Sequence, residues 1–226
     1  MRKPAKKDAL KAVSKAHVVY KTSDGRRVPG TTTITGMLNK PTLVSWANRL
    51  GLEGIDSSKY VDAAAEIGTA AHRMIECYFT GQEFEKEMYS PHALSLAENS
   101  MISFYEWAGR HEIEVQGTEM QLTSDTLLYG GTIDCLCTID GVPTLLDFKT
   151  SKAIYDEHFI QLAAYRALLE EAGHPVERCR ILRVGRDETE GFEERTIIDT
   201  TKHFEIFEHL LKVYYLRREI GREFKS

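Results

Sequence analysis

The sequence contains few cysteines and no long hydrophobic run. Its four cysteines are Cys77, Cys135, Cys137 and Cys179, and no two of them have the C-x-x-C spacing typical of zinc or iron–sulfur sites. We therefore expect buried free thiols and no iron–sulfur cluster. No stretch approaches the ~18 apolar residues of a membrane span, so neither a spanning segment nor a membrane partner is expected.

The chain also lacks the excess of positive charge that tight nucleic-acid binders usually carry, because its formal net charge is −5. Residues 1–15, in contrast, carry a positive charge, because they contain six basic residues and one acidic residue, Asp8. They predict a basic tail, which is either a solvated segment or an arm that attracts phosphate. No apolar stretch follows it, so we expect no secretory signal and a cytoplasmic protein.

The remaining residues, 16–226, have a length and composition that suit one globular domain. A short hairpin is expected over 17–29 and a first helix up to Gly51. Further helices are expected at 59–79, 91–110, 156–172 and about 201–220, with strands within 112–150 and at about 176–185 and 192–199. This order predicts an α/β fold in which a mixed sheet is flanked by helices.

A predicted hairpin places several charged residues together. The dipeptide 140–141, Asp-Gly, is a favoured two-residue turn between strands. Counting outward from that turn puts Asp134 directly opposite Asp147, and Thr132 opposite Lys149. Strand side chains alternate between faces, so Asp147 and Lys149 share one face.

Two opposed carboxylates repel each other unless a proton or a cation lies between them. All-oxygen ligation suits a hard cation such as Mg²⁺ or Mn²⁺. The alternative is an exposed sheet edge on which Asp147 and Lys149 form a surface ion pair. The apolar residues around them are typical of interior strands, which favours a metal site.

These residues fall within "GGTIDCLCTIDGVPTLLDFKTSK", followed by "QLAAY" and preceded by "GTAAH". Residues 30–170 thus resemble the PD-(D/E)XK nucleases, specifically the RecB-like exonuclease branch. The lead-in "VPGTTTITGML" is similar to that of small phage and mitochondrial members that act on DNA ends. The helicase and the cysteine cluster of some relatives are absent, so the resemblance implies a free-standing nuclease with a restriction-endonuclease-like core.

The resemblance implies roles for the motif residues. Asp134 and Asp147 would hold one or two Mg²⁺ or Mn²⁺ ions, helped by the backbone carbonyl of Phe148 and by His72. Lys149 would orient or deprotonate the attacking water and stabilise charge developing on phosphorus.

Further residues complete the predicted site. Gln161 and Tyr165 are four apart on one helix, so both can face the site and position Lys149, water or a phosphate. Glu119 is either a further metal carboxylate or part of a sheet-edge ion pair. Glu76 either orients the nearby histidine or lies near the metal, or it is a solvated helix residue.

Three hydroxyl residues, Thr69, Thr150 and Ser151, are predicted to contact DNA, although those at the strand end can instead serve the turn. The expected activity is exonucleolytic digestion of DNA from single-stranded or recessed ends. The small-residue helix at 59–79 and the N-terminal segments are expected to form a passage that only a free strand can enter. Two alternatives are a structure-specific endonuclease and an inactive DNA-binding scaffold. Expected partners are DNA and a single-strand annealing or binding protein, in a bacterial host if a phage encodes the chain.

Overall fold

The computed structural model describes residues 18–38, 40–187 and 189–223. The predicted tail, 1–15, lies outside these residues. Within them the chain forms a five-stranded mixed sheet in the order β3-β4-β5-β6-β7. The strands are β3 (Ile113–Ser124), β4 (Tyr129–Ile139), β5 (Val142–Lys149), β6 (Arg178–Val184) and β7 (Phe192–Ile197). Only β5 and β6 pair in parallel, because a helix connects them.

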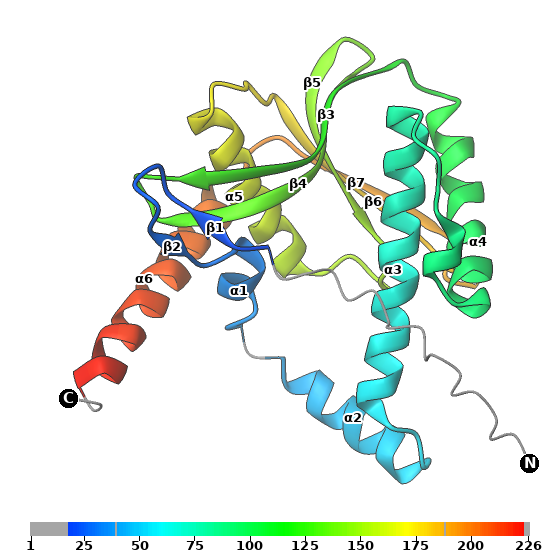
Figure 1. Ribbon diagram of the computed structural model, residues 1–226, viewed down its shortest axis with the longest axis horizontal. Helices are drawn as coiled ribbons and strands as arrows, with labels where there is room; N and C mark the ends of the chain where they lie inside the picture. The colour runs from blue at the N-terminus through cyan, green and yellow to red at the C-terminus, as the bar shows by residue number, and fades with distance from the viewer. Residues whose placement is uncertain (1–17, 39, 188, 224–226) are drawn as a thin grey trace, which may run out of the picture.

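Helices cover both faces of the sheet (Figure 1). The long helices α3 (Ser57–Thr80) and α4 (Pro91–Ala108) pack on one face, and α5 (Asp156–Glu171) and α6 (Thr201–Glu223) pack on the other. Smaller elements are the hairpin β1 (Tyr20–Lys21) and β2 (Arg27–Val28), α1 (Thr31–Thr35), α2 (Pro41–Leu52) and the 3-10 turn η1 (Lys86–Met88). The predicted α/β fold with flanking helices is confirmed.

Each face of the sheet has its own apolar core. Cys135, Leu146 and Phe148 pack with residues of α3 and α4, whereas Leu136 and Leu145 pack with residues of α5 and α6. All four cysteines are buried free thiols, as expected. Alternation along β4 and β5 therefore fills two cores at once, which fixes both strands in the middle of the molecule.

The predicted elements are confirmed, with small shifts at their ends. Helix α2 continues through Gly51 to Leu52, and the left-handed residue beyond it is Gly54, with φ of 74°. The sequence-based reading missed α1, whose five residues are mostly threonine, a weak helix former. No helix among the described residues is long and apolar enough to cross a membrane.

The hairpin at 140–141 has the predicted register, because Ile139 pairs with Val142 and the ladder continues to Cys135 opposite Leu146. Beyond that pair β4 and β5 no longer pair with each other, and each keeps only its other neighbour. Strand β4 continues along β3 to Tyr129, and β5 continues along β6 as far as Lys149. The predicted facing pairs at Asp134 and Lys149 are therefore not part of the β4–β5 ladder.

Candidate active site

A cleft of about 420 Å³ opens where β4 and β5 part. Its lining includes the seven side chains predicted to bind metal or to act in catalysis, namely His72, Glu119, Asp134, Asp147, Lys149, Gln161 and Tyr165. They come from α3, β3, β4, β5 and α5. We call this space the carboxylate cleft.

The side chain of Asp134 takes a hydrogen bond at the point where β4 and β5 separate. The backbone N–H of Phe148 donates a hydrogen bond of 2.9 Å to the Asp134 Oδ2 atom. The Phe148 amide would otherwise continue the β4–β5 ladder, and here it donates to the Asp134 carboxylate instead. This bond holds the carboxylate where the two strands separate. Metal ligation by the Phe148 carbonyl stays a prediction.

Asp147 is almost completely buried, with 1% of its surface exposed, and it lies beside Lys149. The Lys149 Nζ atom is 2.6 Å from its Oδ2 atom. Burial raises the pKa of Asp147 to about 6, although Lys149 opposes this shift; Asp134 adds to it. A buried carboxyl with a pKa near neutrality is a common feature of catalytic sites.

Asp134 shows the opposite behaviour. Burial alone would raise its pKa, but His72, Lys149 and the Phe148 N–H together hold that pKa well below its ordinary value. The His72 Nδ1 atom is 3.5 Å from Asp134 Oδ2, and it is buried without a hydrogen-bond partner among the described residues. A buried imidazole nitrogen facing a carboxylate in this way is an arrangement that a bound cation would satisfy.

Glu119 supplies a second carboxylate on the same side. Thr118 pairs with Cys135 and Met120 with Ile133, which leaves Glu119 level with Asp134. Glu119 has a left-handed φ of 47°, uncommon for a residue with a side chain. Such backbone distortion is concentrated at functional sites.

One ligand atom from each of His72, Glu119 and Asp134 lies within 4.8 Å of the other two. This donor set of two carboxylates and an imidazole fits a divalent cation. Asp147 is not part of this group, and its Oδ2 atom is 2.6 Å from Lys149 Nζ. Its other oxygen is not engaged by that contact, so metal ligation by Asp147 stays a prediction.

Gln161 and Tyr165 both face the cleft from α5, as predicted. The Gln161 amide donates a 2.7 Å hydrogen bond to the Tyr165 hydroxyl. The ring of Tyr165 lies against Gly131, where a Cβ atom would be only 2.6 Å from the ring. The glycine therefore lets α5 approach the strand that carries Asp134.

The N-terminal hairpin and α1 also line the cleft. The N-terminal segments were expected to form part of a passage, but no motif indicated these particular residues. The Tyr20 hydroxyl is 2.8 Å from Thr132 Oγ1, and the Tyr20 ring packs directly on Gly130. Thr31 donates from its hydroxyl to the Gly130 carbonyl at 3.0 Å. The adjacent glycines before Thr132 were the available signal, because such pairs often mark a close approach of another segment.

Four other predicted residues do not line the cleft. The hydroxyls of Thr69 and Ser151 donate to the carbonyls of Ala65 and Ala153, so in this conformation neither can also donate to a phosphate. Thr150 lies against Gly68, and Glu76 forms a 2.7 Å ion pair with Arg73. Their roles in DNA binding or in orienting His72 stay predictions.

No protein-family model matches this sequence, and the comparison with curated proteins found no match. Among solved structures, the chain is similar to a candidate exonuclease from Eubacterium rectale, with 15% identity and a TM-score of 0.46 over 69% of this chain. That likeness spans 65% of the other protein, less than two thirds of its length.

A second similar structure is LHK-Exo, an alkaline exonuclease from Laribacter hongkongensis, determined in complex with dAMP. It has 13% identity and a TM-score of 0.40, and the likeness covers 72% of this chain and 88% of LHK-Exo. At these TM-scores the likeness is partial, so we base the function on the geometry of the cleft itself.

Proposed function

We propose that this protein is a metal-dependent deoxyribonuclease of the PD-(D/E)XK superfamily, in its RecB-like branch, which hydrolyses DNA from its ends. The observation that carries the proposal is the grouping of a low-pKa carboxylate, a buried carboxyl and a lysine where two strands part. Carboxylates for a hard cation next to a cation for the phosphate are what phosphodiester hydrolysis needs.

His72, Glu119 and Asp134 would hold a Mg²⁺ or Mn²⁺ ion, which when bound would polarise the phosphate and lower the pKa of water. Asp147 holds Lys149 at the cleft through their 2.6 Å ion pair. Lys149 then directs its remaining N–H donors to the attacking water or to the charged phosphate. Its stabilising effect grows as negative charge develops in the transition state.

The N-terminal hairpin and α1 support an end-dependent mode of action. They add one wall of the carboxylate cleft, where Tyr20 and the segment Gly30–Thr33 face the site residues of α3, β4 and β5. A cleft walled by separate segments on several sides suits a single strand threaded from a free end better than a continuous duplex.

The two alternatives predict different results. A structure-specific endonuclease would use the same cleft but would cut closed DNA as well as linear DNA. An inactive scaffold would normally lack one of the two aspartates or the lysine, and here Asp134, Asp147 and Lys149 line one cleft. The exonuclease is therefore the function that the geometry supports best.

Digestion of end-labelled single-stranded, blunt, recessed and circular DNA tests the proposal. We expect the linear substrates to be degraded in Mg²⁺ and to survive in EDTA, with single-stranded or recessed ends preferred. Equal digestion with and without a divalent cation would contradict metal dependence.

A further inference from the structure

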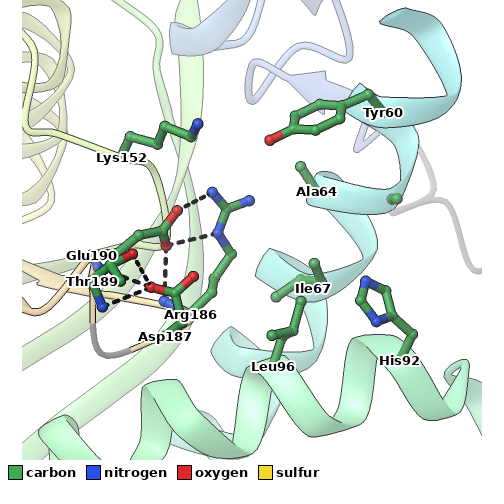
Figure 2. A pocket seen from close by; sticks show the side chains of 11 residues that line it. Tyr60, Ala64, Ile67, His92, Leu96, Lys152, Arg186, Asp187, Thr189 and Glu190 are labelled. Atoms are coloured by element: carbon green, nitrogen blue, oxygen red, sulfur yellow. Dashed lines mark hydrogen bonds and ion pairs between the residues drawn. The ribbon is translucent and has the colours of Figure 1, made fainter. Parts of the chain in front are cut away.

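A second and larger cavity, about 580 Å³, lies beside the carboxylate cleft. It is bounded by the first half of α3, by α4, by the turn between β6 and β7, and by Lys152 (Figure 2). We call it the α3 cavity. None of its lining residues belongs to the carboxylate cleft.

One side of the α3 cavity is apolar and has small side chains near the ring of Tyr60. Ala63, Ala64 and Ile67 from α3 and Leu96 from α4 form the apolar part. Tyr60 is 38% exposed, and its ring stands above Ala64 (Figure 2). The edge-to-face contact between Tyr60 and Trp46, with ring centroids 5.6 Å apart, holds that ring in place. A fixed aromatic ring above small side chains suits a flat aromatic ligand.

The charged groups on the opposite side of the cavity mostly cancel. Arg186 forms a bidentate ion pair with Glu190, and the Asp187 carboxylate accepts hydrogen bonds from the turn around it. Lys152 is exposed, and its ammonium group points into the gap toward Tyr60 (Figure 2). Among the described lining residues, the cavity therefore combines an apolar place for a planar ring with the exposed ammonium group of Lys152, and His92 lies at the apolar side. This combination matches a nucleobase and its phosphate.

The α3 cavity and the carboxylate cleft share two segments. Helix α3 lines the cavity up to Ile67 and the cleft at His72, and the chain after β5 provides Lys149 to the cleft and Lys152 to the cavity. The two segments meet between these places, where Thr150 Oγ1 would be 3.0 Å from a Cβ atom on Gly68.

The distance between the two spaces is short. Ala64 and His72 are eight residues apart on α3, which is about 12 Å of helix. A stacked strand covers that distance in about three to four nucleotides at 3.4 Å each. One strand that crosses over the contact between Gly68 and Thr150 would therefore reach both spaces.

We propose that the α3 cavity binds an unpaired nucleotide of the DNA strand that the carboxylate cleft cuts, with its base against Tyr60 and its phosphate near Lys152. This inference rests on the proposed nuclease function and extends it. The enzyme would need about three to four unpaired nucleotides on one side of the scissile phosphate, because a paired base cannot enter the cavity.

A double-mutant cycle between protein and DNA tests the proposal. The probes are a fluorescent single strand of about eight nucleotides and the same strand with abasic residues throughout, which keeps the phosphates and removes the bases. Their affinities are measured by anisotropy in Ca²⁺. Tyr60→Ala should weaken binding of the normal strand about tenfold and of the abasic strand less than about twofold, because stacking needs a base.

Two further variants and one control sharpen the test. Tyr60→Phe keeps the ring and should bind like wild type, whereas Ala64→Trp fills the cavity and should reproduce the base-selective loss. Tyr105→Ala removes a tyrosine of α4 that is 52% exposed and does not line the cavity, so it should change neither affinity. Equal losses for both strands with Tyr60→Ala, or no loss for either, would overturn the proposal.

The outcome can be separated from that of the proposed function. If wild type cuts DNA in Mg²⁺ but Tyr60→Ala shows no base-selective loss, the α3 cavity does not bind a nucleotide and the nuclease function stands. If wild type neither cuts DNA in Mg²⁺ nor binds either strand in Ca²⁺, the nuclease function fails and this inference fails with it.

Discussion

At the residue scale, Asp134 and Asp147 have different environments, which shift their pKa values in opposite directions. Asp134 accepts the Phe148 N–H and lies near His72, so it stays ionised and suits a metal ligand. Asp147 is buried beside Lys149 and is close to taking up a proton near neutral pH. Two carboxyls whose pKa values are pushed apart usually have different roles.

The raised pKa of Asp147 predicts how stability depends on pH when metal is absent. A rise from 3.8 to about 6 means that the folded protein holds this proton more tightly than the unfolded chain. Asp147 therefore contributes stability that is fully present below about pH 4 and is lost as the pH rises through 6. Asp147→Asn should make the protein about 1–3 kcal/mol more stable than wild type at pH 7.5, and equally stable at pH 4.

The comparison is made by thermal unfolding in EDTA at both pH values. His158 also affects stability in this pH range, because burial, and after it Lys149, lowers its pKa to about 4. Its contribution to stability grows as the pH rises, opposite to that of Asp147. His158 is present in both proteins, so its contribution cancels in the difference between variant and wild type. A stability difference between variant and wild type that does not change between pH 4 and 7.5 would show that Asp147 has an ordinary pKa.

Lys149 is expected to act on the chemical step. Lys149→Ala should lower the single-turnover cleavage rate by about 10² or more, because the lost interaction strengthens in the transition state. DNA binding in Ca²⁺ should weaken only modestly, since one phosphate contact carries a small share of the affinity. Lys212→Ala, an exposed lysine of α6, is the matched control. A wild-type rate for Lys149→Ala at saturating DNA would remove its catalytic role.

At the element scale, the glycines of β4 decide how closely other segments approach the site strand. Gly131→Ala would place a Cβ atom 2.6 Å from the buried Tyr165 ring, so the ring and Gln161 would have to move. We expect a loss of about 1–3 kcal/mol in unfolding free energy, together with lower activity. Gly51→Ala in α2 meets no atom within 4 Å and should leave stability equal or higher. Equal thermal stability of the two variants would contradict tight packing at Gly131.

Elements with local signals could be predicted from the sequence. The Asp-Gly turn alone determined the register from Ile139 to Cys135. The end of that ladder could not be predicted in the same way, because it depends on the Phe148 amide bonding to a side chain and on β6 pairing with β5. The position of the Glu119 side chain could not be predicted either, because Glu119 itself has a left-handed backbone inside β3. A glycine at that position would have been the usual sequence signal for such a backbone.

At the scale of the whole molecule, the site is assembled from segments that are distant in sequence. The motif residues His72, Asp134, Asp147 and Lys149 were predicted correctly to lie in one cleft. The N-terminal segments were expected to form part of a passage, but the particular contacts of Tyr20 and α1 were not predicted. Those contacts arise from an isolated bridge between Gly30 and Gly130 and from packing on that glycine. Motifs identify the groups that do chemistry, whereas the walls around them follow from tertiary contacts.

Those walls predict dependence on DNA ends. Covalently closed single-stranded circles should survive in Mg²⁺, and the same strand should be degraded once linearised, because the proposed mechanism requires a free end that threads into the carboxylate cleft. The measurement is gel analysis of matched circular and linear strands over time. Rapid loss of the circles would favour the endonuclease instead.

The central claim is that cleavage occurs at the carboxylate cleft, and Asp134→Asn tests it most directly. Release of nucleotides from end-labelled single-stranded DNA is measured in Mg²⁺ for wild type and variant, after thermal unfolding has shown that both are folded. Asn keeps the size of the side chain and can still accept the Phe148 hydrogen bond, but it removes the negative charge beside His72. We predict that wild type degrades the DNA and that Asp134→Asn does not; a folded variant that cuts at a near wild-type rate would contradict the claim.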